Sequence, residues 1–333
     1  MGQQRIILIH GRSIKPAKKP FAAMQKRALL NGLDRYDPKQ AAKVRSGAVK
    51  FETVYFGDIN NTIMCASSSK INARLTAKDP DARGAHCLPH APIEAALDDL
   101  LKIKTFNKAA YDKVLRNNRD NRFLDDAARA VSTLAALTTL STLNVAAITY
   151  ATADMGAYLT DHNISSEIRE RLQTPLRRAL QKGDDICLIS HSMGCMVAYD
   201  VLWKFSRLSE YRKIQDSGAR VAKWLTLGCP LGEAGVKANL LDAKSYGHRT
   251  HTDKHPNKII GTWHNVAAKD DFISHDATMR GDYRDMRKFG MLDDIRDRKI
   301  YNCYAQDGKS NPHKLYGYLA NPACSGIVAD WIK

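Results

Sequence analysis

The sequence of 333 residues lacks the paired cysteines of a secreted domain held together by disulfides. Its cysteines number seven, which is odd, and no two of them form a Cys-x-x-Cys pair. This usage predicts reduced thiols and a cytoplasmic protein. The first apolar run, Arg5–Ile9, is too short for the core of a signal peptide, and no small-residue cleavage site follows it. We therefore expect the fold to begin at this run.

Acidic residues are also scarce, with 35 Asp and Glu against 51 Lys and Arg, a formal net charge of +16. Residues 1–33 contain seven Lys or Arg and no acidic residue. A chain this basic is expected to be attracted to an anionic partner. For the N-terminal residues, scattered and solvated surface charge is the preferred interpretation, and attraction to an anionic substrate or, peripherally, to an anionic membrane surface is the alternative. Nucleic acid is not expected, because the sequence has no zinc finger, no RNA-recognition signature and no interleaved basic and aromatic residues.

Charge is missing altogether from Val131–Ala153, a stretch of 23 residues. That is nominally the length of a membrane span, but nine of the 23 residues are Ser, Thr or Asn. The preferred interpretation is a buried helix or helix pair. A hydrophobic lid beside the active site is the second interpretation, and a transmembrane helix is the third.

Short runs rich in β-branched residues alternate with helical stretches along the rest of the chain. This alternation predicts an α/β fold with a mostly parallel sheet of about six strands flanked by helices. Residues 59–160 are too long for a plain connection and are predicted to form a helical cap, with residues 1–58 and 161–333 as the core. The predicted helices are Phe21–Leu33, Ile164–Leu180 and Met193–Phe205; the predicted strands are Arg5–Ile9, Val49–Phe56, Asp185–Ser190, Lys223–Leu227, Ile259–Ala267 and Lys299–Tyr304.

The strongest chemical signal lies where the third predicted strand meets a helix with no loop between them. The residues there are Ser190-His191-Ser192-Met193-Gly194. A turn this tight requires small residues two positions before and two positions after its centre, and Ser190 and Gly194 meet that requirement. Ser192 would then project above the strand ends, at the positive end of the following helix.

This segment resembles the nucleophile elbow of the α/β-hydrolase superfamily, in the His-Ser-Met-Gly variety common among lipases and esterases. One departure is that Ser190 replaces the usual first glycine. The resemblance implies an α/β-hydrolase fold, with Ser192 as the nucleophile and a catalytic triad in the chain order Ser, Asp, His.

The same resemblance places the acid after the strand that ends near Ala267, where Asp270 and Asp271 are adjacent. Matching these residues to the family's Asp-Pro-x-Val pattern favours Asp270, with Asp271 as the alternative and Asp276 third. The histidine is expected after the last strand, which identifies His313.

His10-Gly11-Arg12 follows the first strand, as His-Gly-x does in this superfamily. The resemblance therefore implies an oxyanion hole made of the backbone N–H groups of Arg12 and Met193. His10 is expected to be a structural member of the His-Gly turn, and His191 is expected to pack beside the elbow.

The predicted function is that of a serine hydrolase that cleaves carboxylic esters of small molecules or lipids through an acyl-enzyme, without a metal or organic cofactor. The alternatives are a phospholipase or thioesterase acting at an anionic membrane surface, and a catalytically silent binding module. The spacing of His248, His251 and His255 could suit a metal, but no acidic or cysteine residue is in position to complete the ligand set. The oligomeric state stays open.

Overall fold

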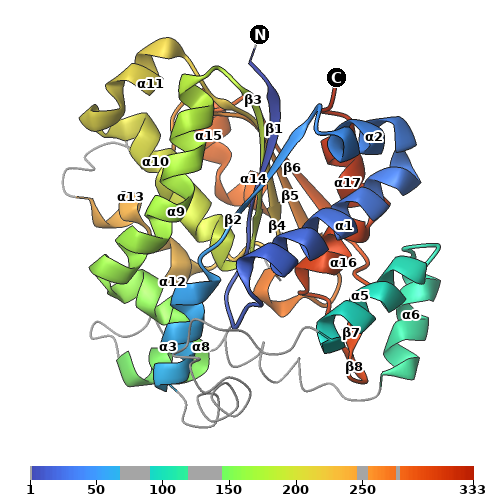
Figure 1. The fold of residues 1–333 in the computed structure, drawn as a ribbon. Coiled ribbons are helices and arrows are strands. Elements are labelled where there is room, and N and C mark those ends of the chain that lie inside the picture. The colour runs from blue at the N-terminus through green and yellow to red at the C-terminus, as the bar shows by residue number, and fades with distance from the viewer. Residues whose placement is uncertain (1, 68–90, 119–144, 246–253, 275–277) are drawn as a thin grey trace.

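A parallel sheet of six strands forms the centre of the protein in the computed structural model, which describes residues 2–67, 91–118, 145–245, 254–274 and 278–333 (Figure 1). The strands lie in the order β2-β1-β3-β4-β5-β6, and every neighbouring pair is parallel. The predicted α/β architecture is thus confirmed. The strands are β1 (Gln4–Ile9), β2 (Lys50–Val54), β3 (Asp185–His191), β4 (Val221–Leu227), β5 (Ile260–Ala268) and β6 (Asp294–Ile300), and a separate antiparallel pair is formed by β7 (Ala305–Gln306) and β8 (Lys309–Ser310).

Helices cover both faces of the sheet (Figure 1). One face carries α1 (Lys18–Tyr36), α2 (Pro38–Ser46), α16 (Leu315–Ala320) and α17 (Pro322–Ala329). The other carries α9 (His162–Gln181), α10 (Met193–Arg207) and α11 (Arg212–Ser217). Shorter elements complete the described chain: α12 (Ala234–Lys237), α13 (Leu241–Lys244), α14 (Met279–Asp282), α15 (Arg284–Lys288), η1 (Ser209–Tyr211) and η3 (Phe272–Ser274).

The sheet separates two hydrophobic cores, because alternate residues of a strand point to opposite faces. In β1, Ile7 and Ile9 belong to the core under α9 and α10, whereas Ile6 and Leu8 belong to the core under α1 and α16. All four side chains are fully buried. Burial on both faces explains why β1 is an unbroken apolar run.

The last strand is the one that the sequence analysis placed wrongly. The prediction was Lys299–Tyr304, but β6 spans Asp294–Ile300. Four consecutive residues in the middle of β6 are exposed because it lies at the edge of the sheet. A charged edge strand lacks the apolar run on which the prediction depended, and charged side chains also protect such an edge from pairing with other chains.

The described parts of the predicted cap are helical: α3 (Gly57–Ser67), α5 (Ala91–Lys102), α6 (Lys108–Asn117) and α8 (Val145–Thr160). They pack at two separate places, α3 on α8 and α8 on α9, and α5 on α1 and α16. Of the uncharged stretch, residues 131–144 lie outside the described residues, and the remainder begins α8. Within the described ranges, no helix is long and apolar enough to cross a membrane.

Helix α1 does not end next to Gly32, at the predicted Leu33, but continues to Tyr36. Gly32 instead permits close packing between helices. A Cβ atom at this position would lie 2.4 Å from the carbonyl oxygen of Leu319 in α16 and 2.7 Å from the hydroxyl of Ser325 in α17.

We therefore expect Gly32→Ala to destabilise the protein, although alanine normally favours a helix. The overlap with a backbone oxygen outweighs the gain in helix propensity, so the free energy of unfolding should fall by about 1–2 kcal/mol. Gly281→Ala is the matched control, because the nearest atom to its added Cβ is 3.9 Å away. Urea denaturation of both variants checks this; equal stability of the two would contradict it.

Candidate active site

Ser192 lies in a strained turn between β3 and α10. Its φ of 55° and ψ of −129° are unusual for a residue with a side chain. The strain is imposed by close packing, since a Cβ atom on Gly194 would lie 2.4 Å from the carbonyl oxygen of His10. Ser190 fits the crowded turn because its hydroxyl accepts a hydrogen bond of 2.9 Å from the indole nitrogen of Trp224.

The structure brings the Ser192 hydroxyl and the His313 imidazole together, as predicted, with Oγ 2.8 Å from Nε2. The loop that carries the histidine is held on both sides by Asn302. Its side-chain amide donates to the carbonyl oxygens of Pro312 at 2.8 Å and Lys314 at 2.9 Å. Asn302 is fully buried. The sequence analysis missed it, although a polar residue following the last strand within an apolar run is a signal worth testing.

The carboxylate beside His313 belongs to Asp271, so the preference for Asp270 was wrong. Both oxygens of Asp271 lie 2.9 Å from Nδ1 of His313. Asp270 takes a left-handed backbone conformation, with φ of 60°, and its exposed side chain accepts a hydrogen bond of 3.1 Å from the Tyr111 hydroxyl in α6. The turn at Asp270 directs that side chain outward and the next one inward. Asp276 lies outside the described residues.

Asp271 is buried and receives further hydrogen bonds that orient it. The Tyr318 hydroxyl donates to Oδ2 in a short hydrogen bond, and the backbone N–H of Ile273 donates to Oδ1 at 3.0 Å. Burial and the neighbouring carboxylate raise the pKa of Tyr318 well above its ordinary value, which keeps it protonated as a donor. Tyr318 was not predicted, since no local pattern connects it to Asp271.

A second histidine, His191, holds the backbone of His313. Its Nε2 donates to the backbone oxygen of His313 at 2.7 Å, and the two ring centres are 4.8 Å apart. Burial, and then the charge of His313, lower the pKa of His191 well below its ordinary value. A neutral ring with its proton on Nε2 satisfies this geometry. The expectation that His191 packs beside the turn is confirmed.

The loop after β1 passes directly against Ser192. A Cβ atom on Gly11 would lie 2.6 Å from that of Ser192. The buried carboxylate of Asp154 in α8 holds this loop, because it accepts from Nε of Arg12 at 3.2 Å and from the backbone N–H of Ser13. Within the described part of the chain, the backbone N–H of Arg12 has no hydrogen-bond acceptor.

His10 is a structural residue, as expected. Its Nδ1 donates to the carbonyl oxygen of Gly11 at 2.7 Å, and its Nε2 accepts from the backbone N–H of Phe56 at 3.1 Å. Met193 is the first residue of α10, so its N–H has no partner inside the helix. The two predicted oxyanion donors therefore lie on the two backbone segments that meet at Ser192.

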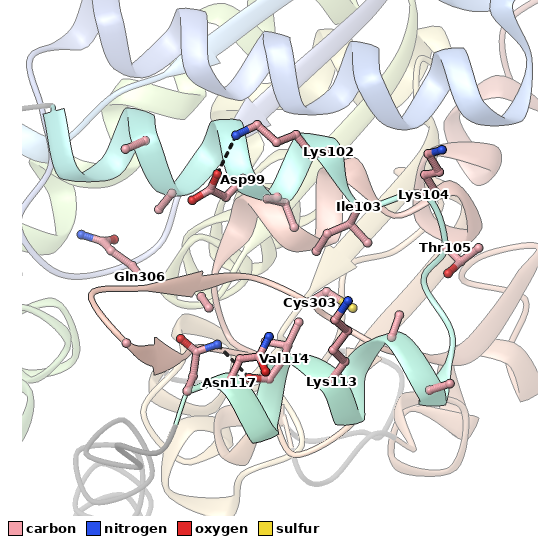
Figure 2. Close-up of a pocket in the computed structure, with 18 of the residues that line it drawn as sticks. Asp99, Lys102, Ile103, Lys104, Thr105, Lys113, Val114, Asn117, Cys303 and Gln306 are labelled. Carbon is pink, nitrogen blue, oxygen red and sulfur yellow. Dashed lines mark hydrogen bonds and ion pairs between the residues drawn. The ribbon is translucent and has the colours of Figure 1, made fainter.

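A cavity of about 260 Å³ opens in front of Ser192 and His313. Its wall combines the loop after β1 with Asn311, residues 313–316 and the apolar side chains of Ile93 and Ile273. A larger cavity, of about 960 Å³, lies elsewhere, between α5, α6 and the β7–β8 pair (Figure 2). Lys102, Val114 and Cys303 line this larger cavity, which contains none of the three residues of the Ser192–His313–Asp271 series.

No metal-binding group of three or more His, Cys, Asp or Glu side chains occurs among the described residues. His248 and His251 lie outside them. His255 is described, and its Nδ1 lies 2.8 Å from the Tyr199 hydroxyl.

Comparisons of the chain with models of protein families, with curated proteins and with solved structures gave no match. The chemistry of the site is therefore inferred from its geometry.

The two adjacent carboxylates make a direct test of that geometry. We expect Asp271→Asn to slow the reaction of Ser192 with a fluorophosphonate probe by roughly three to four orders of magnitude, because the imidazole loses the partner that fixes its tautomer. Asp270→Asn should slow it less than about tenfold, since asparagine also tolerates the left-handed conformation. Labelling rates measured by mass spectrometry decide which of the two carboxylates acts on His313. A larger loss for Asp270→Asn than for Asp271→Asn would favour Asp270.

Gly228 gives a second test. It has φ of 54°, and a Cβ atom there would lie 2.9 Å from Oδ2 of Asp271 and from Nδ1 of His313. Gly228→Ala should therefore displace these groups and slow labelling of Ser192 by about a hundredfold. Gly218→Ala controls for backbone strain, because Gly218 is also left-handed but has no atom within 4 Å of the added Cβ. Equal labelling by both variants would contradict this role for Gly228.

Proposed function

We propose that the chain is a serine hydrolase of the α/β-hydrolase type that cleaves carboxylic esters. The observation that carries the proposal is the continuous hydrogen-bonded series from the Ser192 hydroxyl through His313 to the buried carboxylate of Asp271. A serine, a histidine and a carboxylate joined in this order form the arrangement that activates a hydroxyl for attack on a carbonyl carbon.

The position of the site in the sheet supports the proposal. β1 lies between β2 and β3 in the sheet. From β1 the chain first goes to β2, at one edge of the sheet, and later returns to form β3 on the opposite side of β1. Open parallel sheets bind ligands at such a point, beyond the carboxyl ends of the strands. Gly11 and Ser192 follow β1 and β3 at this point, and the cavity opens between their two loops.

The mechanism follows from the donors and acceptors present. Nε2 of His313 removes the proton from Ser192 as Oγ forms a bond to the carbonyl carbon of the ester. Asp271 accepts the Nδ1 proton of His313 in a hydrogen bond and stabilises the imidazolium. The N–H groups of Arg12 and Met193 bind the negative oxygen of the tetrahedral intermediate, an effect typically worth about 10²–10³ in rate per donor.

The intermediate then collapses. The C–O bond to the alcohol breaks, and His313 gives its proton to the departing oxygen. In the second half of the reaction, His313 takes a proton from water as the water oxygen attacks the acyl carbon. The bond between that carbon and Oγ of Ser192 then breaks, His313 returns its proton to Oγ, and the acid is released. The strained turn keeps Oγ in place for both halves, since the crowding around Gly194 leaves it little room to move.

Hydrolysis of 4-nitrophenyl esters with acyl chains of two to sixteen carbons tests the proposal. We expect Ser192→Ala to abolish turnover while the protein keeps its melting temperature. Ser190→Ala is the matched control: it removes a hydroxyl two residues away that faces Trp224, and it should retain turnover.

Turnover that survives Ser192→Ala would refute the nucleophile. Turnover of phospholipid or thioester substrates alone would favour the alternative enzymes. If the folded protein cleaved none of these substrates and Ser192 did not react with a fluorophosphonate, the chain would be a silent binding module.

A further inference from the structure

Two lysines face the cavity that contains Ser192. Lys15 comes from the loop after β1, and Lys314 follows His313 directly. Neither side chain forms an ion pair with a carboxylate of the described residues. Nζ of Lys15 donates to the carbonyl oxygens of Arg12 and Ser13, whereas Nζ of Lys314 lies 5.5 Å from the centre of the Tyr304 ring.

The carboxylates near the cavity are already engaged. Asp154 binds Arg12 and the backbone of Ser13, and it attracts Lys15 only from beyond ion-pair distance. Asp271 binds His313 and Tyr318. The described wall of the cavity therefore holds more positive than negative charge, and that excess grows when His313 takes the serine proton.

Burial disfavours the charged forms of the two lysines. Burial, and then repulsion from Lys314, lower the pKa of Lys15 to about 7. Burial lowers the pKa of Lys314 to about 8. A group that is forced toward its neutral form by desolvation regains its charge when an opposite charge comes within about 4–6 Å. An anion in the cavity would supply that charge to both lysines.

We propose that the natural substrates are esters that carry an anionic group, a carboxylate or a phosphate, which binds between Nζ of Lys15 and Nζ of Lys314 while the ester carbonyl lies at Ser192. This inference rests on the proposed esterase function and adds the substrate class. Lys314 is adjacent in sequence to His313, so the anionic group lies close to the scissile bond. The apolar side chains of Ile93 and Ile273 accommodate the carbon chain.

The test uses two esters that differ by one negative charge and one methyl group. 4-Nitrophenyl hemiglutarate carries a free carboxylate, and its methyl ester is neutral, but both release nitrophenol from the same carbonyl. We expect kcat/KM to be higher for the anionic ester. Lys15→Met and Lys314→Met should each lower the anionic-to-neutral ratio of kcat/KM by about tenfold or more, because each removes a charged hydrogen-bond donor.

Methionine keeps most of the aliphatic stem of each lysine, and the ratio cancels any general loss of activity. Lys18→Met is the matched control. Lys18 is an exposed lysine at the start of α1, outside the cavity, so its removal should leave the ratio unchanged.

The outcomes separate the two proposals. If neither ester shows Ser192-dependent turnover, the esterase function fails. If turnover depends on Ser192 but the ratio is near one, or is unchanged in both cavity variants, the anionic subsite is refuted and the esterase function stands.

A further comparison identifies the source of the anion. Fatty-acid release is measured from dihexanoyl phosphatidic acid as monomers and from vesicles of long-chain phosphatidic acid, with the lysine variants in both assays. Lysine-dependent turnover of the monomers assigns the subsite to small soluble anions. Lysine-dependent turnover of the vesicles alone assigns it to a lipid headgroup. If neither lysine variant changes the turnover of monomers or of vesicles, the result counts against the subsite.

Discussion

The contact between two backbone segments at the carboxyl ends of β1 and β3 is the constraint on which the site depends. The carbonyl of His10 lies where a side chain on Gly194 would have to be, and Gly11 lies where a side chain would meet Ser192. The crowding keeps Ser192 in its strained conformation and brings the backbone at Gly11 against it. Hydrogen bonds of His10 and Asp154 hold the first segment, and the second is the first turn of α10.

The remaining groups are positioned by hydrogen bonds between segments that are distant in sequence. Asn302 holds the backbone on both sides of His313, and His191 holds its carbonyl. Tyr318 orients Asp271 and also accepts a hydrogen bond of 2.8 Å from the backbone N–H of Ala268, the last residue of β5. Asp271 and His313 are therefore fixed relative to the sheet. Because several hydrogen bonds hold them, the loss of one leaves the others in place.

The order of elements and the positions of Ser192 and His313 could be predicted because they depend on local patterns, namely buried strands followed by turns. The acid could not, because Asp270 and Asp271 are chemically identical and only the left-handed turn at Asp270 decides which one points inward. The predicted start of β6 was five residues too late, because an edge strand can be charged and so lacks the apolar run on which the prediction depended. Tyr318 and Asn302 act through contacts that exist only in the completed fold.

The sequence separation of the three principal residues has a consequence for synthesis of the protein. Ser192 and His313 are 121 residues apart, and His313 and Asp271 are 42 residues apart. Contacts over such distances form late in folding, since the intervening chain must first be ordered. On a ribosome, the segment with Ser192 emerges long before the C-terminal segment with His313 and Tyr318. The hydrogen-bonded series that begins at Ser192 is therefore complete only after the C-terminal segment, with His313 and α16, has docked.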